Sequence, residues 1–116
     1  MAFDMITAVR IRTILAGRNV VEQPMMGGLC FMVDGHMCVC TKADTLMVRV
    51  GAGAQARALA EPHVRPVEMR GRCMPSFVRV EADGFATDAS LAAWIDRGLA
   101  FVSTLPPKQR AARPRR

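Results

Sequence analysis

The sequence predicts an α+β domain in which helices pack on an antiparallel sheet of about five strands, in the order α-β(3)-α-β(2)-α. Two turn signals carry most of this prediction. Asp34-Gly35 separates two apolar runs, and such a pair is the strongest short signal for a β-hairpin because both turn positions need a positive φ. Arg70-Gly71-Arg72 separates two further runs. Segments with helical composition or periodicity lie before, between and after these hairpins.

The first helix is expected from an Asp4 cap to about Ala16, with Gly17 as its left-handed stop. Its apolar residues are compatible with one stripe that would face the core. They are Met5, Ile6, Val9, Thr13 and Leu15.

Three strands are expected next, at Leu29–Val33, His36–Lys42 and Thr45–Val50. Counting back from the Asp34-Gly35 turn places Val33 opposite His36, Phe31 opposite Cys38 and Leu29 opposite Cys40. One face of this meander is then wholly apolar and is expected to be the main core: Cys30, Met32, Met37, Val39, Leu46, Val48 and Val50. The other face carries Leu29, Phe31, Val33, His36, Cys38, Cys40, Met47 and Arg49.

The second face is also mostly apolar, whereas an antiparallel sheet usually exposes one polar face to water. A large bare apolar patch is unusual on a monomer. Either a helix of the same chain covers this face, or another protein does. The candidate partner surface is Leu29, Phe31, Cys38, Cys40 and Met47.

The remaining elements follow from local signals. Residues 51–60 are rich in Ala and predict a short helix that Pro62 ends. Val64–Met69 and Cys73–Glu81 form the second hairpin. A last helix runs from a cap at Asp88 or Thr87 to Ser103, and Gly98 within its apolar stripe allows another backbone to approach closely.

The length of 116 residues fits one domain, expected over residues 1–105, followed by a disordered basic tail over 106–116. The tail holds five of the 16 Lys and Arg residues and no acid, so the rest of the chain is nearly neutral despite a formal net charge of +6. Such a tail binds phosphate backbones without sequence preference or remains a solvated terminus. The candidate nucleic-acid contacts are Lys108, Arg110, Arg113, Arg115 and Arg116.

No apolar run is long enough for a membrane span, and charges interrupt the first residues, so we expect no membrane contact and a cytoplasmic location. The four cysteines contain no C-x-x-C pair. In the cytoplasm they are expected to stay reduced, as buried small apolar residues and not as a disulfide or a zinc site.

No constellation of residues predicts catalysis. His36 and Cys38 lie on one strand about 7 Å apart with nothing to orient the imidazole, and a metal site of His36, Cys38 and Cys40 lacks a fourth ligand. The ten acids are spread singly. We therefore expect no enzyme activity, no cofactor and no small-molecule substrate.

The segment 25–37, MMGGLCFMVDGHM, resembles the signature M-F-G-G-hydrophobic-x-F-x-V-D/N-G-x-M of the TfoX/Sxy N-terminal-domain family. Residues 46–50, 71–74, 88–99 and 105–108 are similar to later pieces of that family, so the resemblance spans about residues 5 to 108. Many members place basic residues before the Gly-Gly pair, where this chain has Glu22-Gln23-Pro24.

The resemblance implies an α-β(3)-α-β(2)-α fold and a non-enzymatic regulatory domain, since the family's namesakes regulate natural competence and assist transcription activation. We therefore expect a stand-alone interaction module with a protein partner or a second copy of itself, linked to regulation of transcription or competence. The alternative is non-specific nucleic-acid binding through the tail.

Overall fold

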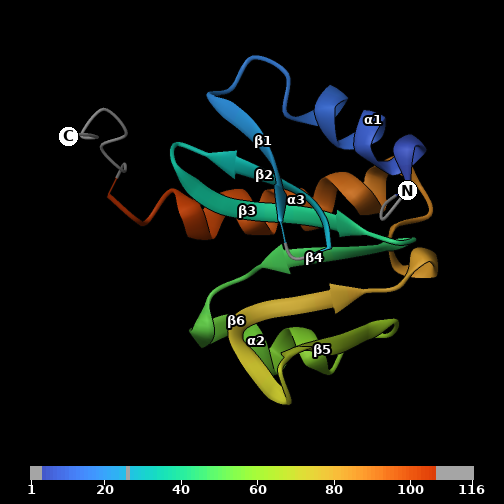
Figure 1. Cartoon of the computed structure of the whole chain (residues 1–116). Helices are drawn as coiled ribbons and strands as arrows, with labels where there is room; N and C mark the ends of the chain where they lie inside the picture. The colour runs from blue at the N-terminus through green and yellow to red at the C-terminus, as the bar shows by residue number, and fades with distance from the viewer. Residues whose placement is uncertain (1–3, 26, 107–116) are drawn as a thin grey trace.

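The computed structural model describes residues 4–25 and 27–106, and it confirms the predicted α+β fold class (Figure 1). Within these residues the helices are α1 (Met5–Ile14), α2 (Ala52–Leu59) and α3 (Asp88–Val102), with a short 3₁₀ turn η1 (Ala82–Phe85). The strands are β1 (Val20–Met25), β2 (Gly28–Val33), β3 (His36–Lys42), β4 (Thr45–Arg49), β5 (Val64–Met69) and β6 (Arg72–Val80).

The strands form one antiparallel sheet in the order β1-β2-β3-β4-β6-β5. Strand β1, which the sequence did not predict, adds a sixth strand at one edge. Pro24 is tolerated in β1 because proline has no N–H to donate, and one side of an edge strand has no neighbouring strand that would need this hydrogen bond. In Figure 1 helix α3 runs behind β3 and β4, with α1 beside it.

The local signals that start and stop the elements behave as expected. Asp34 and Gly35 both have positive φ, at 52° and 86°, as the predicted hairpin turn requires. Asp4 caps α1 by accepting a hydrogen bond from the N–H of Ile6. Thr87 caps α3 and forms a reciprocal pair of hydrogen bonds with Ser90.

The predicted register of the first hairpin is right for its first two pairs and wrong beyond them. Val33 lies opposite His36 and Met32 opposite Met37, but a bulge follows, so that Phe31 lies opposite Val39 and Leu29 opposite Thr41. A bulge puts one extra residue on one strand. The extra residue on β3 is Cys38, and from there on every predicted pairing between β2 and β3 shifts by one position.

The bulge turns Cys38 toward α3, where Gly98 makes room for it. A Cβ at position 98 would lie 3.0 Å from the Cys38 sulfur and 3.2 Å from its carbonyl oxygen. The predicted close approach at Gly98 is thereby confirmed, and its partner is the bulged strand.

The main core lies between the sheet and the helices. From β2, β3 and β4 it takes Leu29, Phe31, Val33, Cys38, Val39, Leu46 and Val48. Helix α3 contributes Leu91, Trp94, Ile95 and Val102, and the indole N–H of Trp94 donates to the Gly84 carbonyl.

The predicted apolar stripe of α1 is wrong except for Leu15, since Thr13 is exposed as well as its first three members. The buried residues are Thr7, Ala8 and Ile11, together with Leu15 just after the helix. Met5, Ile6 and Val9 point to solvent instead, because the helix face formed by Thr7, Ala8 and Ile11 is the one that packs on the core.

Candidate functional site

The side of the sheet away from the helices carries a second apolar cluster made only of strand residues. Its floor is Cys30, Cys40, Met47, Val67 and Phe77, each less than 9% exposed. Half-buried methionines pack around this floor: Met25, Met32, Met37, Met69 and Met74. We call these ten residues the methionine face.

No residue of a described helix belongs to the methionine face, yet its floor is almost fully buried. The methionine side chains themselves provide the cover. Methionine is unbranched, with three rotatable bonds and a polarisable sulfur, so it fills irregular gaps and rearranges readily. The cover is therefore movable in a way that a packed helix would not be.

A shallow hollow of about 220 Å³ adjoins the methionine face at its β1 end. It is lined by Asn19, Val21, Gln23, Met32 and Gly35. Val21 is 48% exposed there, so the apolar surface continues from Met32 onto the edge strand.

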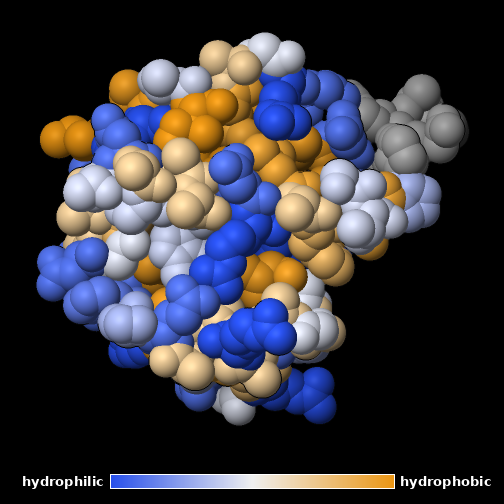
Figure 2. Space-filling view, turned by 180° about the vertical axis from the view of Figure 1, so that it is seen from behind, coloured by the Kyte–Doolittle hydropathy of each residue, from blue (hydrophilic) through white to orange (hydrophobic). Residues whose placement is uncertain are grey.

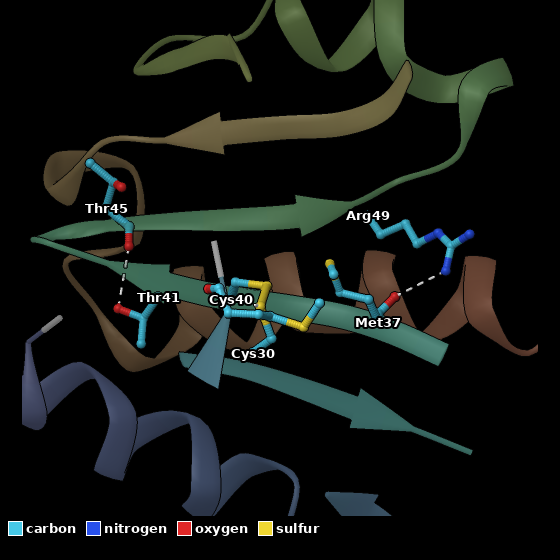
Figure 3. The surroundings of a disulfide bond; sticks show 7 residues. Cys30, Met37, Cys40, Thr41, Thr45 and Arg49 are labelled. Carbon is cyan, nitrogen blue, oxygen red and sulfur yellow. Dashed lines mark hydrogen bonds between the residues drawn. A yellow bond between two sulfur atoms is a disulfide. The ribbon is translucent and has the colours of Figure 1, made fainter. Parts of the chain in front are cut away.

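A disulfide joins Cys30 of β2 to Cys40 of β3 in the middle of the methionine face (Figure 3). The two residues lie directly opposite each other, with their Cα atoms 4.0 Å apart. The expectation that all four cysteines are reduced is wrong for this pair. That expectation rested on a reducing cytoplasm and on the absence of a C-x-x-C pair, and the unbulged register placed Cys30 and Cys40 on opposite faces.

Two arginines border the methionine face: Arg49 at the end of β4, and Arg79 on β6 opposite Met47. The guanidinium of Arg49 sits near the rings of Phe77 and Phe101, at 5.7 and 5.5 Å from their centroids, and donates to the Met37 carbonyl at 3.4 Å (Figure 3). Its Nε is buried without a hydrogen-bond partner. Arg79 donates to the Thr45 hydroxyl at 2.9 Å.

The structure does not bring the predicted partner surface together. Leu29, Phe31 and Cys38 lie in the main core beneath α3, whereas Cys40 and Met47 lie in the floor of the methionine face. The five half-buried methionines were missed as site residues. Their signal is nine methionines in a chain with few aromatics.

His36 and Cys38 do not form a nucleophile and base. The Nε2 of His36 contacts the Pro106 carbonyl at 2.6 Å. Burial raises the pKa of the Cys38 thiol to about 12, so the thiolate needed for attack is not formed at neutral pH. Across residues 4–25 and 27–106 no group of three His, Cys, Asp or Glu side chains is placed to hold a metal ion.

The tail residues proposed as nucleic-acid contacts, Lys108, Arg110, Arg113, Arg115 and Arg116, lie outside the described residues. Among the described helices, none has the length and apolar character of a membrane span.

A second apolar patch lies on the opposite side of the molecule. Met5, Ile6 and Val9 of α1 are 45%, 72% and 52% exposed. Figure 2 shows apolar side chains gathered over this helix, next to a polar band. The patch has no buried floor of its own, because the residues beneath it belong to the main core.

Comparison with known proteins supports the resemblance seen in the sequence. The family model described as the TfoX N-terminal domain matches residues 14–102, which contain all six strands, α2 and α3. No match was found among curated proteins or among solved structures. The family is a regulatory one that is not known as catalytic. The match covers well over half of the chain, which therefore belongs to the TfoX N-terminal domain family.

Proposed function

We propose that this domain is a non-enzymatic protein-interaction module, linked to the regulation of transcription or competence, and that the methionine face is its partner surface. One observation carries the proposal: an apolar sheet face with a buried floor has no helix over it within the described residues. Membership of a family of regulatory domains supports the same reading.

The composition of the face favours binding over simple burial. A second helix would bury the floor more completely than five half-exposed methionines do. Methionine is over-used at surfaces that accept partners of varied shape, because its side chain adapts to each at little strain. A partner that displaces the methionines laterally gains contact with Met47 and Phe77 beneath them.

Site-specific photo-crosslinking in cells of the source organism tests this proposal. A photoreactive amino acid is placed at Met32 in the methionine face, at Ile6 in the α1 patch, or at Ala93 on the exposed side of α3. Each site is on the surface and lies on a different element, so all three variants should fold alike. Circular dichroism checks that they do.

We expect a discrete crosslinked protein from position 32 and none from position 93. Crosslinks only from position 6 would move the partner surface to α1 and overturn the assignment to the methionine face. No crosslink from any position would overturn the interaction role itself.

A second function, non-specific nucleic-acid binding, is favoured by the five cations and absence of acids in residues 106–116. Its test is a full-length chain in which those five residues are replaced by Gln, called here the neutral-tail variant. Binding to duplex DNA should weaken steeply as salt rises for the natural chain and be lost in the variant. Equal affinity of the two chains would rule out a role for the tail.

A further inference from the structure

The methionine face carries a one-sided charge. Among the described strand residues that point to this side, five are cationic and none is acidic. The register aligns Met47, Arg79 and Arg65 in one row across β4, β6 and β5, and Arg49 lies opposite Phe77. Strand alternation adds Lys42, which lies opposite Thr45, and Arg72, which lies opposite Met69.

Acidic side chains near the methionine face neutralise its positive charge only at the β5 end, around Arg65 and Arg79. Glu81 pairs with Arg65 at 2.6 Å, and Glu68 lines the same polar hollow as Arg65 and Arg79. Within the described residues no carboxylate comes within ion-pair distance of Arg49, whose side chain lies at the other end.

Arg49 is held in place although not all of its guanidinium N–H donors are paired within the protein. Phe77 and Phe101 position its guanidinium, and the hydrogen bond to the Met37 carbonyl is long at 3.4 Å. The buried Nε has no partner. A carboxylate binds a guanidinium through two parallel hydrogen bonds, and an already oriented guanidinium loses little entropy in making them.

These charges decide between classes of partner. A second copy of this face would bring like charges together, which costs free energy. Single-stranded nucleic acid needs aromatic platforms for its bases, whereas the one aromatic ring in this face, Phe77, is 8% exposed. A protein segment with apolar and acidic side chains matches both the methionines and the arginines.

We propose that the methionine face binds an acidic, apolar protein segment and that Arg49 holds one of its carboxylates. This inference rests on the proposed function and adds the chemistry of the partner. The apolar side chains of the segment lie on Met32 and Met37, above the floor residue Met47, and a Glu or Asp side chain reaches Arg49 beside Met37.

Fluorescence anisotropy with synthetic peptides tests the inference, using the full-length neutral-tail variant so that the tail does not bind the probes. The probes are a panel of amphipathic peptides with Leu, Met or Phe at the apolar positions and Glu at the polar ones. Matched panels carry Gln or Lys in place of Glu, and oligothymidylate serves as the nucleic-acid probe.

We expect the Glu panel to bind best. Arg49→Met, which keeps the apolar contact with both rings, should weaken Glu-peptide binding about tenfold and leave Gln-peptide binding unchanged. Arg57→Met, which removes an exposed cation from α2, is the matched control and should change neither.

Equal binding of the Gln and Glu panels, or an equal effect of Arg57→Met, would overturn the acidic specificity and leave the interaction role standing. Binding of oligothymidylate that Arg49→Met abolishes would replace the protein segment with nucleic acid. Failure of every Glu peptide to bind would refute the inference, while the crosslinking experiment decides the proposed function separately.

Discussion

The sulfur of Cys38 packs against Gly98, so that the bulge of β3 and the middle of α3 are fitted to each other. Both backbones depend on this contact. The bulge sends Cys38 to the helix side next to Val39, and the missing side chain at position 98 lets α3 approach the sheet. The pairing of β2 with β3, which decides which residues share the methionine face, therefore depends on a contact on the opposite side of the sheet.

Replacing Gly98 by Ala should destabilise the protein. Alanine gains up to about 1 kcal/mol in helix propensity over glycine. Overpacking a close-packed core costs about 1–3 kcal/mol, and the new methyl group would meet the backbone oxygen of Cys38, which cannot rotate away. We expect a net loss of about 1 kcal/mol in the free energy of unfolding, measured by urea titration.

The double variant Gly98→Ala with Cys38→Ala is the control. Removing the sulfur relieves the closer of the two contacts, so the double variant should be more stable than the sum of the two single changes allows. Strict additivity would show that Cys38 and Gly98 do not constrain each other.

Thiol titration in denaturant should find two free thiols, Cys38 and Cys73, and four after reduction. Reduction should also lower the free energy of unfolding by up to about 2.7 kcal/mol, the loop-entropy value for a sequence separation of 10. The Cys73→Ser variant is the control and should lose one thiol only. Four free thiols before reduction would contradict the disulfide.

The stability of the fold should fall as the pH rises above about 9. Burial raises the pKa of the Cys38 thiol from 9.0 to about 12, so the folded protein retains a proton that the unfolded chain releases. The unfolded state then binds fewer protons, and stability decreases by up to about 1.4 kcal/mol per pH unit between these two values. The chain has no Tyr to add a second transition in this range.

Urea titrations at about pH 8 and about pH 10 measure this effect, and Cys38→Ala should remove most of it. In the same protein iodoacetamide should modify exposed Cys73 rapidly and leave Cys38 unmodified until the chain unfolds. Rapid alkylation of Cys38 in the folded state would contradict its burial.

Thr87→Ala should destabilise α3 by about 1 kcal/mol, because the Thr87 hydroxyl accepts the Ser90 N–H that the first helical turn leaves free. Thermal unfolding of the variant measures the loss. Thr87→Ser keeps the hydroxyl and should restore most of the stability; an equally unstable Ser variant would assign the effect to the lost methyl group.

Turn chemistry and helix periodicity predicted most of the fold. Asp34-Gly35, the Thr87 cap and Gly98 each occupy the place that their local signal indicated. Strand β1 was missed because it contains the polar residues Glu22 and Gln23 followed by Pro24. Pairing with β2 makes it a strand, and an edge position tolerates both features.

The candidate surface could be predicted only in part. That the sheet is apolar on both faces is visible in the sequence, but which residues share a face depends on the bulge at Cys38. Nothing local marks that position, since the bulge is stabilised by Gly98, sixty residues further along the chain. One extra residue moves Phe31 from Cys38 to Val39 and brings Cys30 opposite Cys40, while Met32 stays opposite Met37.

The bond between Cys30 and Cys40 records which alignment of β2 and β3 the chain has adopted. In the unbulged alignment the two sulfurs would lie on opposite sides of the hairpin and could not meet. Among folded molecules, only those with the bulge at Cys38 bring the two sulfurs together, so oxidation of this pair under native conditions fixes the bulged alignment of the two strands.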